Sequence, residues 1–149
     1  MIARAWTAVA ALAAVAALAG CGSDSLSEAQ LRSRALRVCT QAAGRLDRIQ
    51  APRRPADAKG FLERGVSALQ PELVSLGRLS PPPELSGAYE RGRTAVGQEV
   101  GTLQSTIKGL NAGNDPAVAV KTLQQQLRPL EQRARTAWHA VGVPACADS

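Results

Sequence analysis

The chain contains a single histidine, His139, and this scarcity limits the chemistry that it can perform. At 100° per residue His139 projects away from the apolar stripe of its helical segment, so we expect it at the surface. One outward-facing histidine cannot hold zinc or copper unaided, and the C-x-x-C-H motif that attaches c-type haem is missing. We therefore expect no metal, haem or other cofactor.

Side chains suited to acid–base or nucleophilic catalysis also lack a catalytic arrangement. The 12 carboxylates are scattered along the chain, mostly at the starts of helical segments or beside arginine. We expect none of them inside an apolar stripe, where burial would raise the pKa of a carboxyl into a useful range. No Gly-x-Ser-x-Gly motif is present, and His139 has no acidic neighbour in sequence. The prediction is a protein without enzymatic activity.

Arginines form the one charged pattern that exceeds what the composition requires. Four of them project onto one side of the first helical segment, beside its apolar face, and two more follow in the next turn. The pattern predicts contact with an anionic partner such as lipid head groups, wall polymer or an acidic protein face. The alternative is a solvated helix face. This basic stripe consists of Arg34, Arg37, Arg45, Arg48, Arg53 and Arg54.

Length, charge and aromatic content limit the classes of function that this chain could have. With 149 residues the chain has room for one domain, and its formal net charge of +6 is modest for a nucleic-acid-binding protein. Apart from Trp6 the aromatic residues are Phe61, Tyr89 and Trp138, too few for base-stacking or sugar-stacking surfaces. We expect no nucleic-acid partner.

The N-terminal segment has the parts of an export signal. Residues 1–6 carry one positive side chain, Arg4, and residues 7–18 are mostly alanine, valine and leucine. The uncharged stretch is shorter than the roughly 20 residues that a membrane-spanning helix needs. It ends in Leu18-Ala19-Gly20-Cys21.

Those four residues resemble a lipobox, the processing motif of bacterial lipoproteins. In that family the signal peptidase requires small residues before the cut, and the cysteine thiol carries a diacylglyceryl group. The resemblance implies that Cys21 becomes the lipidated N-terminus and holds the protein on the outer face of the cell membrane. In a Gram-negative host the outer membrane is favoured, because Gly22 is not the Asp that retains lipoproteins in the inner membrane. The alternative is an ordinary cleaved signal followed by a chance cysteine.

Two cysteines, Cys39 and Cys146, remain once Cys21 is assigned to lipid. An exported domain meets an oxidising compartment, so an even remainder predicts a disulfide. The alternative is two buried free thiols. No C-x-x-C redox motif is present, and we expect the bridge to be structural.

Four segments show the 3.6-residue periodicity of amphipathic helices, and turns rich in proline or glycine separate them. Ser27 and Gln30 fit a capping box, and Asp115 with Pro116 fits an N-cap followed by a first helical residue. Pro71 falls on the side opposite the apolar stripe of its segment, which predicts one kinked helix. The four segments cover residues 27–49, 57–76, 85–110 and 116–141.

Helices of this length with short connections predict an all-α fold, an antiparallel up-down-up-down four-helix bundle. The fourth helix would end beside the start of the first, about 18 Å from Cys39 along that helix. Residues 142–146 span at most about 17 Å when extended, so Cys146 could run back and reach Cys39. Tyr89 and Trp138 would meet at the same end as this bridge. They predict either a small apolar pocket or, as the alternative, ordinary core.

The predicted organisation is a signal peptide over 1–20, a lipidated cysteine and tether over 21–26, and a bundle domain over 27–149. The mature part is similar to the small helical two-cysteine lipoproteins of high-GC Gram-positive bacteria, a resemblance that carries no functional residues. Our leading hypothesis is a non-enzymatic envelope interaction module. The alternative is a carrier that holds a small apolar ligand inside the bundle.

Overall fold

The computed structural model describes residues 25–147 of the chain, and the regular secondary structure of this part is entirely helical. Four α-helices and two short 3-10 helices make up this part, which contains no strand. The predicted signal peptide and the predicted lipidation site, Cys21, lie outside the described residues. The all-α prediction is confirmed.

Helix α1 spans Glu28–Leu46 and starts with the predicted capping box. The Ser27 hydroxyl accepts from the backbone N–H of Gln30, at 3.2 Å, and the Gln30 side chain accepts from the backbone N–H of Ser27, at 3.0 Å. The predicted extension to Ile49 is wrong. The carbonyl of Gly44 accepts from the Arg48 side chain at 2.8 Å rather than from the next helical N–H, and the chain leaves the helix ahead of two prolines.

The second segment begins as a 3-10 helix, η1 (Pro55–Asp57), and continues as α2 (Ala58–Gly77). Pro71 lies inside α2 with its ring exposed, so the segment is one helix, as predicted. A solvent-facing proline is tolerated there because its missing N–H leaves an acceptor that water can reach.

Helices α3 (Pro83–Asn111) and α4 (Pro116–Val141) form the second hairpin. The Asp115 carboxylate accepts from the N–H of Val118 at 3.0 Å, which is the predicted N-cap. Gly142 ends α4 with φ of 82°, a left-handed conformation that glycine adopts without steric cost.

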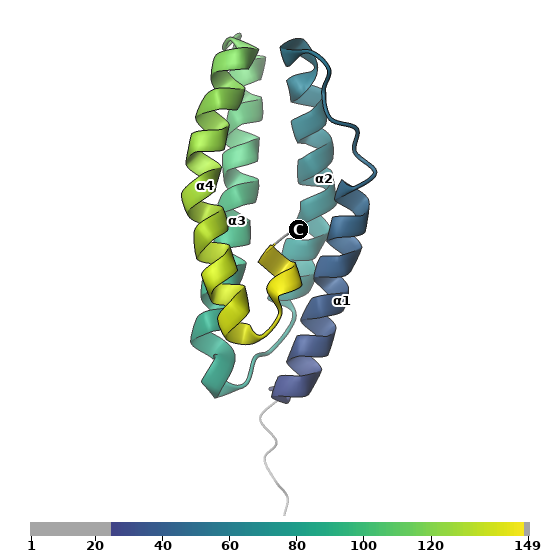
Figure 1. Cartoon of the computed structure of the whole chain (residues 1–149), viewed down its shortest axis with the longest axis vertical. Coiled ribbons are helices and arrows are strands. Elements are labelled where there is room, and N and C mark those ends of the chain that lie inside the picture. The colour runs from purple at the N-terminus through teal and green to yellow at the C-terminus, as the bar shows by residue number, and fades with distance from the viewer. Residues whose placement is uncertain (1–24, 148–149) are drawn as a thin grey trace, which may run out of the picture.

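In Figure 1 the hairpin of α3 and α4 packs beside the hairpin of α1 and α2, with neighbouring helices antiparallel. A final 3-10 helix, η2 (Pro144–Ala147), lies between α4 and α1 and packs against both. The Cys39–Cys146 disulfide joins η2 to α1, as predicted. One core cluster of buried side chains surrounds this bridge: Leu31, Ala35, Cys39, Leu76, Tyr89, Ala95, Val96, Ala134, Trp138, Val141, Val143 and Cys146.

Two long-range hydrogen bonds hold the end of the bundle at which α1 begins. The backbone N–H of Leu26 donates to the carbonyl of Ser80 at 2.8 Å, so the start of the described chain is tied to the turn between α2 and α3. The Arg32 guanidinium donates to the carbonyl of Val141 at 2.9 Å and satisfies one of the last carbonyls of α4. This end of the domain is therefore fixed by backbone contacts as well as by the core.

The opposite end of the bundle is more open. Helix α1 covers only the lower part of Figure 1, and residues 47–54 run from its end toward the start of α2. There α2, α3 and α4 lack a full fourth helix beside them, and η1 makes contacts with α4 instead. None of the helices between residues 25 and 147 is long and apolar enough to cross a membrane.

Candidate functional site

Tyr89 and Trp138, the residues of the predicted pocket, are both fully buried and in contact with each other. Their ring centroids lie 5.5 Å apart at an interplanar angle of 86°, an edge-to-face pair, and the Tyr89 hydroxyl donates to the carbonyl of Leu76 at 2.7 Å. Burial raises the pKa of the Tyr89 hydroxyl well above its ordinary value. These contacts fit the alternative of ordinary core, and neither residue lines the clefts described below.

The basic stripe of α1 divides into residues that are engaged within the fold and residues that are not. The half-buried Arg45 donates to the carbonyl of Ala68 on α2 at 3.0 Å, and Arg48 donates to its own helix. Arg54 is ion-paired with Asp57 at 3.0 Å. The interaction raises the pKa of the Arg54 guanidinium and lowers that of the Asp57 carboxyl. Arg53 is exposed in the connection between α1 and η1.

Arg34 and Arg37, the other two members of the stripe, meet a third arginine from a different helix. They line a groove of about 370 Å³ between α1 and α2 together with Arg78, which caps the C-terminus of α2. The remaining lining residues are Val38, Gln41, Ser75 and Leu79. We refer to Arg34, Arg37 and Arg78 as the arginine cluster.

Within residues 25–147 none of the three guanidiniums of the arginine cluster makes a hydrogen bond or an ion pair. All three residues are exposed. Guanidinium groups bind carboxylates and phosphates through paired N–H donors, so converging arginines without acidic partners favour an anionic ligand. Sequence reasoning found Arg34 and Arg37 but missed Arg78, because its closeness to them depends on how α1 packs on α2.

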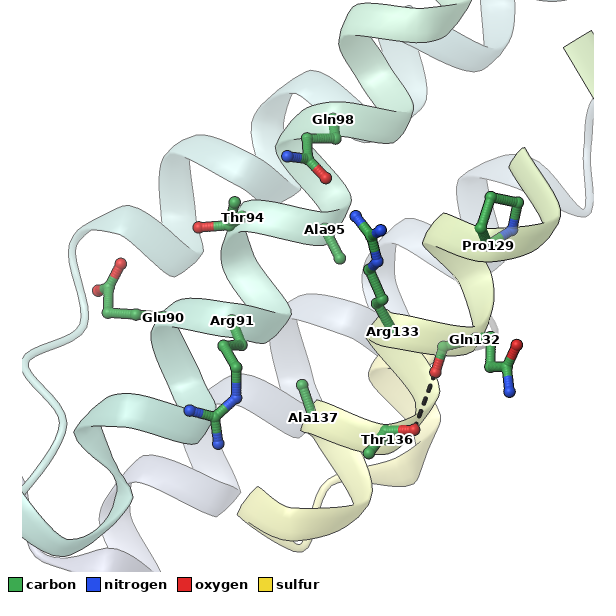
Figure 2. A pocket seen from close by; sticks show the side chains of 10 residues that line it. All are labelled: Glu90, Arg91, Thr94, Ala95, Gln98, Pro129, Gln132, Arg133, Thr136 and Ala137. Atoms are coloured by element: carbon green, nitrogen blue, oxygen red, sulfur yellow. Dashed lines mark hydrogen bonds between the residues drawn. The ribbon is translucent and has the colours of Figure 1, made fainter. Parts of the chain in front are cut away.

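A second groove, of about 610 Å³, runs between α3 and α4 on the outside of the bundle (Figure 2). Its floor is formed by two small buried residues, Ala95 and Ala137. Polar and charged side chains stand along its two walls: Glu90, Arg91, Thr94 and Gln98 from α3, and Gln132, Arg133 and Thr136, next to Pro129, from α4.

Several polar groups of this outer groove are already engaged. Glu90 is ion-paired with Arg93 at 2.7 Å. The Thr136 hydroxyl donates to the carbonyl of Gln132 at 3.0 Å, as Figure 2 shows. The Thr136 hydroxyl is thus engaged with a backbone carbonyl rather than with a general base that would make it a nucleophile. The arrangement offers hydrogen-bonding side chains over a narrow alanine floor. Sequence reasoning did not find it, since it arises from the packing of two helices.

A partly open cleft of about 300 Å³ lies between α2, α3 and α4, with η2 at its edge. Leucines form part of its wall, and Glu99, Glu131 and Arg135 form the polar part, with Ala147 of η2 beside them. Burial, together with the negative charges of Glu131 and the fully buried Glu72, raises the pKa of the Glu99 carboxyl to about 7. We refer to this as the acidic cavity.

The acidic cavity corrects the expectation that no carboxylate lies within an apolar stripe. Glu72 falls three residues after Leu69 and four before Leu76, and Glu99 falls three after Val96, so both occupy inward-facing helical positions. The 3.6-residue spacing contained this signal. The inward positions of Glu72 and Glu99 were missed because charged residues were assumed to mark the outer face of each helix.

His139 is exposed in the last turn of α4, as the helical projection predicted. Among residues 25–147 no group of three or more His, Cys, Asp or Glu side chains is placed to hold a metal ion. No family model, curated protein or solved structure matches the chain. Among the described surfaces, the arginine cluster brings three unpaired guanidiniums from two helices to one groove.

Proposed function

We propose that this chain is a lipid-anchored, non-enzymatic envelope protein that presents a basic surface to an anionic component of the envelope. Lipid on Cys21 would hold it on the outer face of the cell membrane, or on the outer membrane of a Gram-negative host. The lipobox residues Leu18-Ala19-Gly20-Cys21 support the anchor. Two acyl chains give stable membrane attachment, whereas a single chain gives only marginal binding.

The observation that carries the proposal is the position of the arginine cluster near the end of the bundle at which α1 begins, where hydrogen bonds fix the chain. Leu26 is tied to Ser80 by a hydrogen bond of 2.8 Å, and Arg78 lies two residues before Ser80. An anchor at Cys21 would therefore bring this part of the domain close to the membrane. A surface protein with unsatisfied guanidiniums at such a place is suited to electrostatic contact rather than to covalent chemistry.

The second candidate function, carriage of a small apolar ligand, is favoured by one observation, the acidic cavity. Leu69, Leu103 and Leu127 line it, and its volume of about 300 Å³ is at the lower end of the range for small-molecule sites. Native mass spectrometry of protein purified without detergent separates the two candidates. A stoichiometric small molecule retained by the protein supports the carrier, and an unliganded mass supports the interaction module.

Fractionation of cells that express the full chain tests the anchor. The wild-type protein is expected in the membrane fraction with its signal removed, and Cys21→Ser is expected to appear as unprocessed or soluble protein. The matched control is Ser23→Cys in the Cys21→Ser background, which restores a cysteine two positions away from the lipobox. Unchanged membrane partition of Cys21→Ser, with the signal cleaved, would contradict the proposal.

A further inference from the structure

We infer that the arginine cluster binds the phosphate groups of anionic phospholipids in the same membrane that holds the anchor. Lipid at Cys21 and phospholipid at Arg34, Arg37 and Arg78 would then fix the orientation of the bundle on the surface. This inference rests on the proposed function, because the anchor brings the cluster to the bilayer.

The cluster is better suited to bind a phosphate group than to bind a single carboxylate on a protein surface. Arg34 and Arg37 stand three residues apart on α1 and so share one helix face, and Arg78 faces the same groove from the end of α2. Each guanidinium offers paired donors to phosphate oxygens. Val38 and Leu79 line the groove beside them, so its wall is partly apolar, as the boundary between head groups and acyl chains is.

The short tether places a limit on how far the cluster can be from the anchor. Five peptide steps separate Cys21 from Leu26, and they span at most about 18 Å in any conformation. The backbone N–H of Leu26 donates to the carbonyl of Ser80, and Arg78 precedes Ser80 by two residues. The tether therefore keeps the cluster within reach of the bilayer. Its limit is longer than the roughly 8 Å over which the attraction to anionic lipids falls off at physiological salt, so the arginines themselves must supply the contact.

The rest of the basic stripe is placed less well for the same contact. Helix α1 has 19 residues and is about 28 Å long, so Arg53 and Arg54 lie beyond the end that is distant from the tether. Arg45 and Arg48 donate hydrogen bonds to backbone carbonyls, and Arg54 forms an ion pair with Asp57. This distribution favours membrane phospholipid over a wall polymer, since a polymer away from the bilayer would meet the distal end first.

Vesicle co-sedimentation of the mature chain, residues 21–149 with Cys21→Ser, tests the inference without the acyl chains that would mask electrostatic binding. The core residues and both bridged cysteines lie between Leu31 and Cys146, so this chain contains the whole folded unit. The probes are vesicles of phosphatidylcholine with and without phosphatidylglycerol. The test variant carries Arg34→Gln, Arg37→Gln and Arg78→Gln.

The matched control variant carries Arg64→Gln, Lys121→Gln and Arg128→Gln, which removes the same number of charges from exposed positions elsewhere. Wild type should bind the anionic vesicles and should bind less as salt rises. The test variant should lose about tenfold or more in partition, and the control variant less than about threefold. A third variant, Arg34→Gln with Arg37→Gln, leaves the end of α2 unchanged and should show an intermediate loss.

Equal losses in the test and control variants would overturn the inference, because they would indicate attraction to net charge alone. Absence of wild-type binding to anionic vesicles would overturn it too, as would binding of a soluble glycerol phosphate polymer in preference to vesicles. Inorganic phosphate at millimolar concentration should compete only weakly if the membrane surface is the ligand. These results are independent of the fractionation of Cys21→Ser, so failure of the site and failure of the anchor are distinguishable.

Discussion

Gly92 of α3 lies against the indole ring of Trp138 on α4, so closely that a Cβ atom on Gly92 would come within 2.7 Å of the ring. The indole is fully buried, and Tyr89 contacts it edge to face, so it has little room to move. The packing of α3 on α4 at this level therefore depends on the missing side chain of a glycine.

Gly92→Ala should destabilise the fold by about 1–3 kcal/mol, because overpacking of a closed core outweighs the higher helix propensity of alanine. Gly101→Ala is the matched control on the same helix, since a Cβ there meets no atom within 4 Å. The control should be neutral or more stable by up to about 1 kcal/mol. Urea unfolding followed by circular dichroism measures both, and a neutral Gly92→Ala would contradict the described packing.

The disulfide should be a structural element whose loss lowers stability. Cys39 and Cys146 are separated by 107 residues and are both buried, so the bridge closes a long loop and pins η2 between α1 and α4. Reduction, or replacement of both cysteines by alanine, should cost roughly 4–5 kcal/mol in the chain-entropy model. The intact mass should rise by about two hydrogens on reduction. Two alkylated thiols in the unreduced protein would refute this prediction.

Arg45 should contribute to stability, whereas Arg37 on the same helix should not. The Arg45 guanidinium donates to the carbonyl of Ala68 at 3.0 Å and joins α1 to α2. Arg45→Gln should cost about 1 kcal/mol, the usual net value of such a bond. Arg37→Gln should stay within about 0.5 kcal/mol of wild type, as a surface change usually does. Equal unfolding midpoints for the two variants would contradict the assignment.

Glu99 should make the fold less stable as pH rises. Burial, with the charges of Glu131 and Glu72, raises the pKa of its carboxyl in the folded state to about 7, from an ordinary value of 4.5. Folding therefore favours the protonated acid, and this contribution is full below about pH 4.5 and is lost as pH rises toward 7. Arg135 also lines the cavity.

Glu99→Gln should remove this dependence and stabilise the protein at pH 8 by roughly 1–3 kcal/mol, allowing for partial solvent screening. Glu84→Gln, at an exposed position in the first turn of α3, is the control and should change stability by about 0.5 kcal/mol or less. Thermal unfolding of the three proteins between pH 4 and pH 8 provides the comparison. A Glu99→Gln variant no more stable than wild type at pH 8 would show that the carboxyl is not in the environment described.

Features of the fold that depend on neighbouring residues were predictable from the sequence. The capping box of Ser27 and Gln30, the N-cap Asp115 and the left-handed Gly142 each act within one helical turn. The end of α1 was placed too late because the apolar residue Ile49 continued the pattern, whereas the carbonyl of Gly44 had a side-chain donor available.

Features that depend on how helices pack were harder to predict from the sequence. The cysteine count, together with the reach of the C-terminal tail, was enough to predict the bridge between Cys39 and Cys146. Nothing local, however, indicated that Arg78 would join Arg34 and Arg37 while Arg45 turned toward α2. The stripe is a pattern of one helix, whereas the groove is a property of two.

The measurement that tests the central claim most directly is the intact mass of the protein extracted from membranes of cells that express the full chain. A lipid-anchored envelope protein should begin at Cys21 and carry the mass of residues 21–149 plus a diacylglyceryl group, with the Cys39–Cys146 bridge intact. Cys21→Ser should yield no species of this mass. A wild-type mass that corresponds to an unmodified chain, cleaved at another residue or not cleaved, would contradict the lipid anchor and with it the membrane orientation of the arginine cluster.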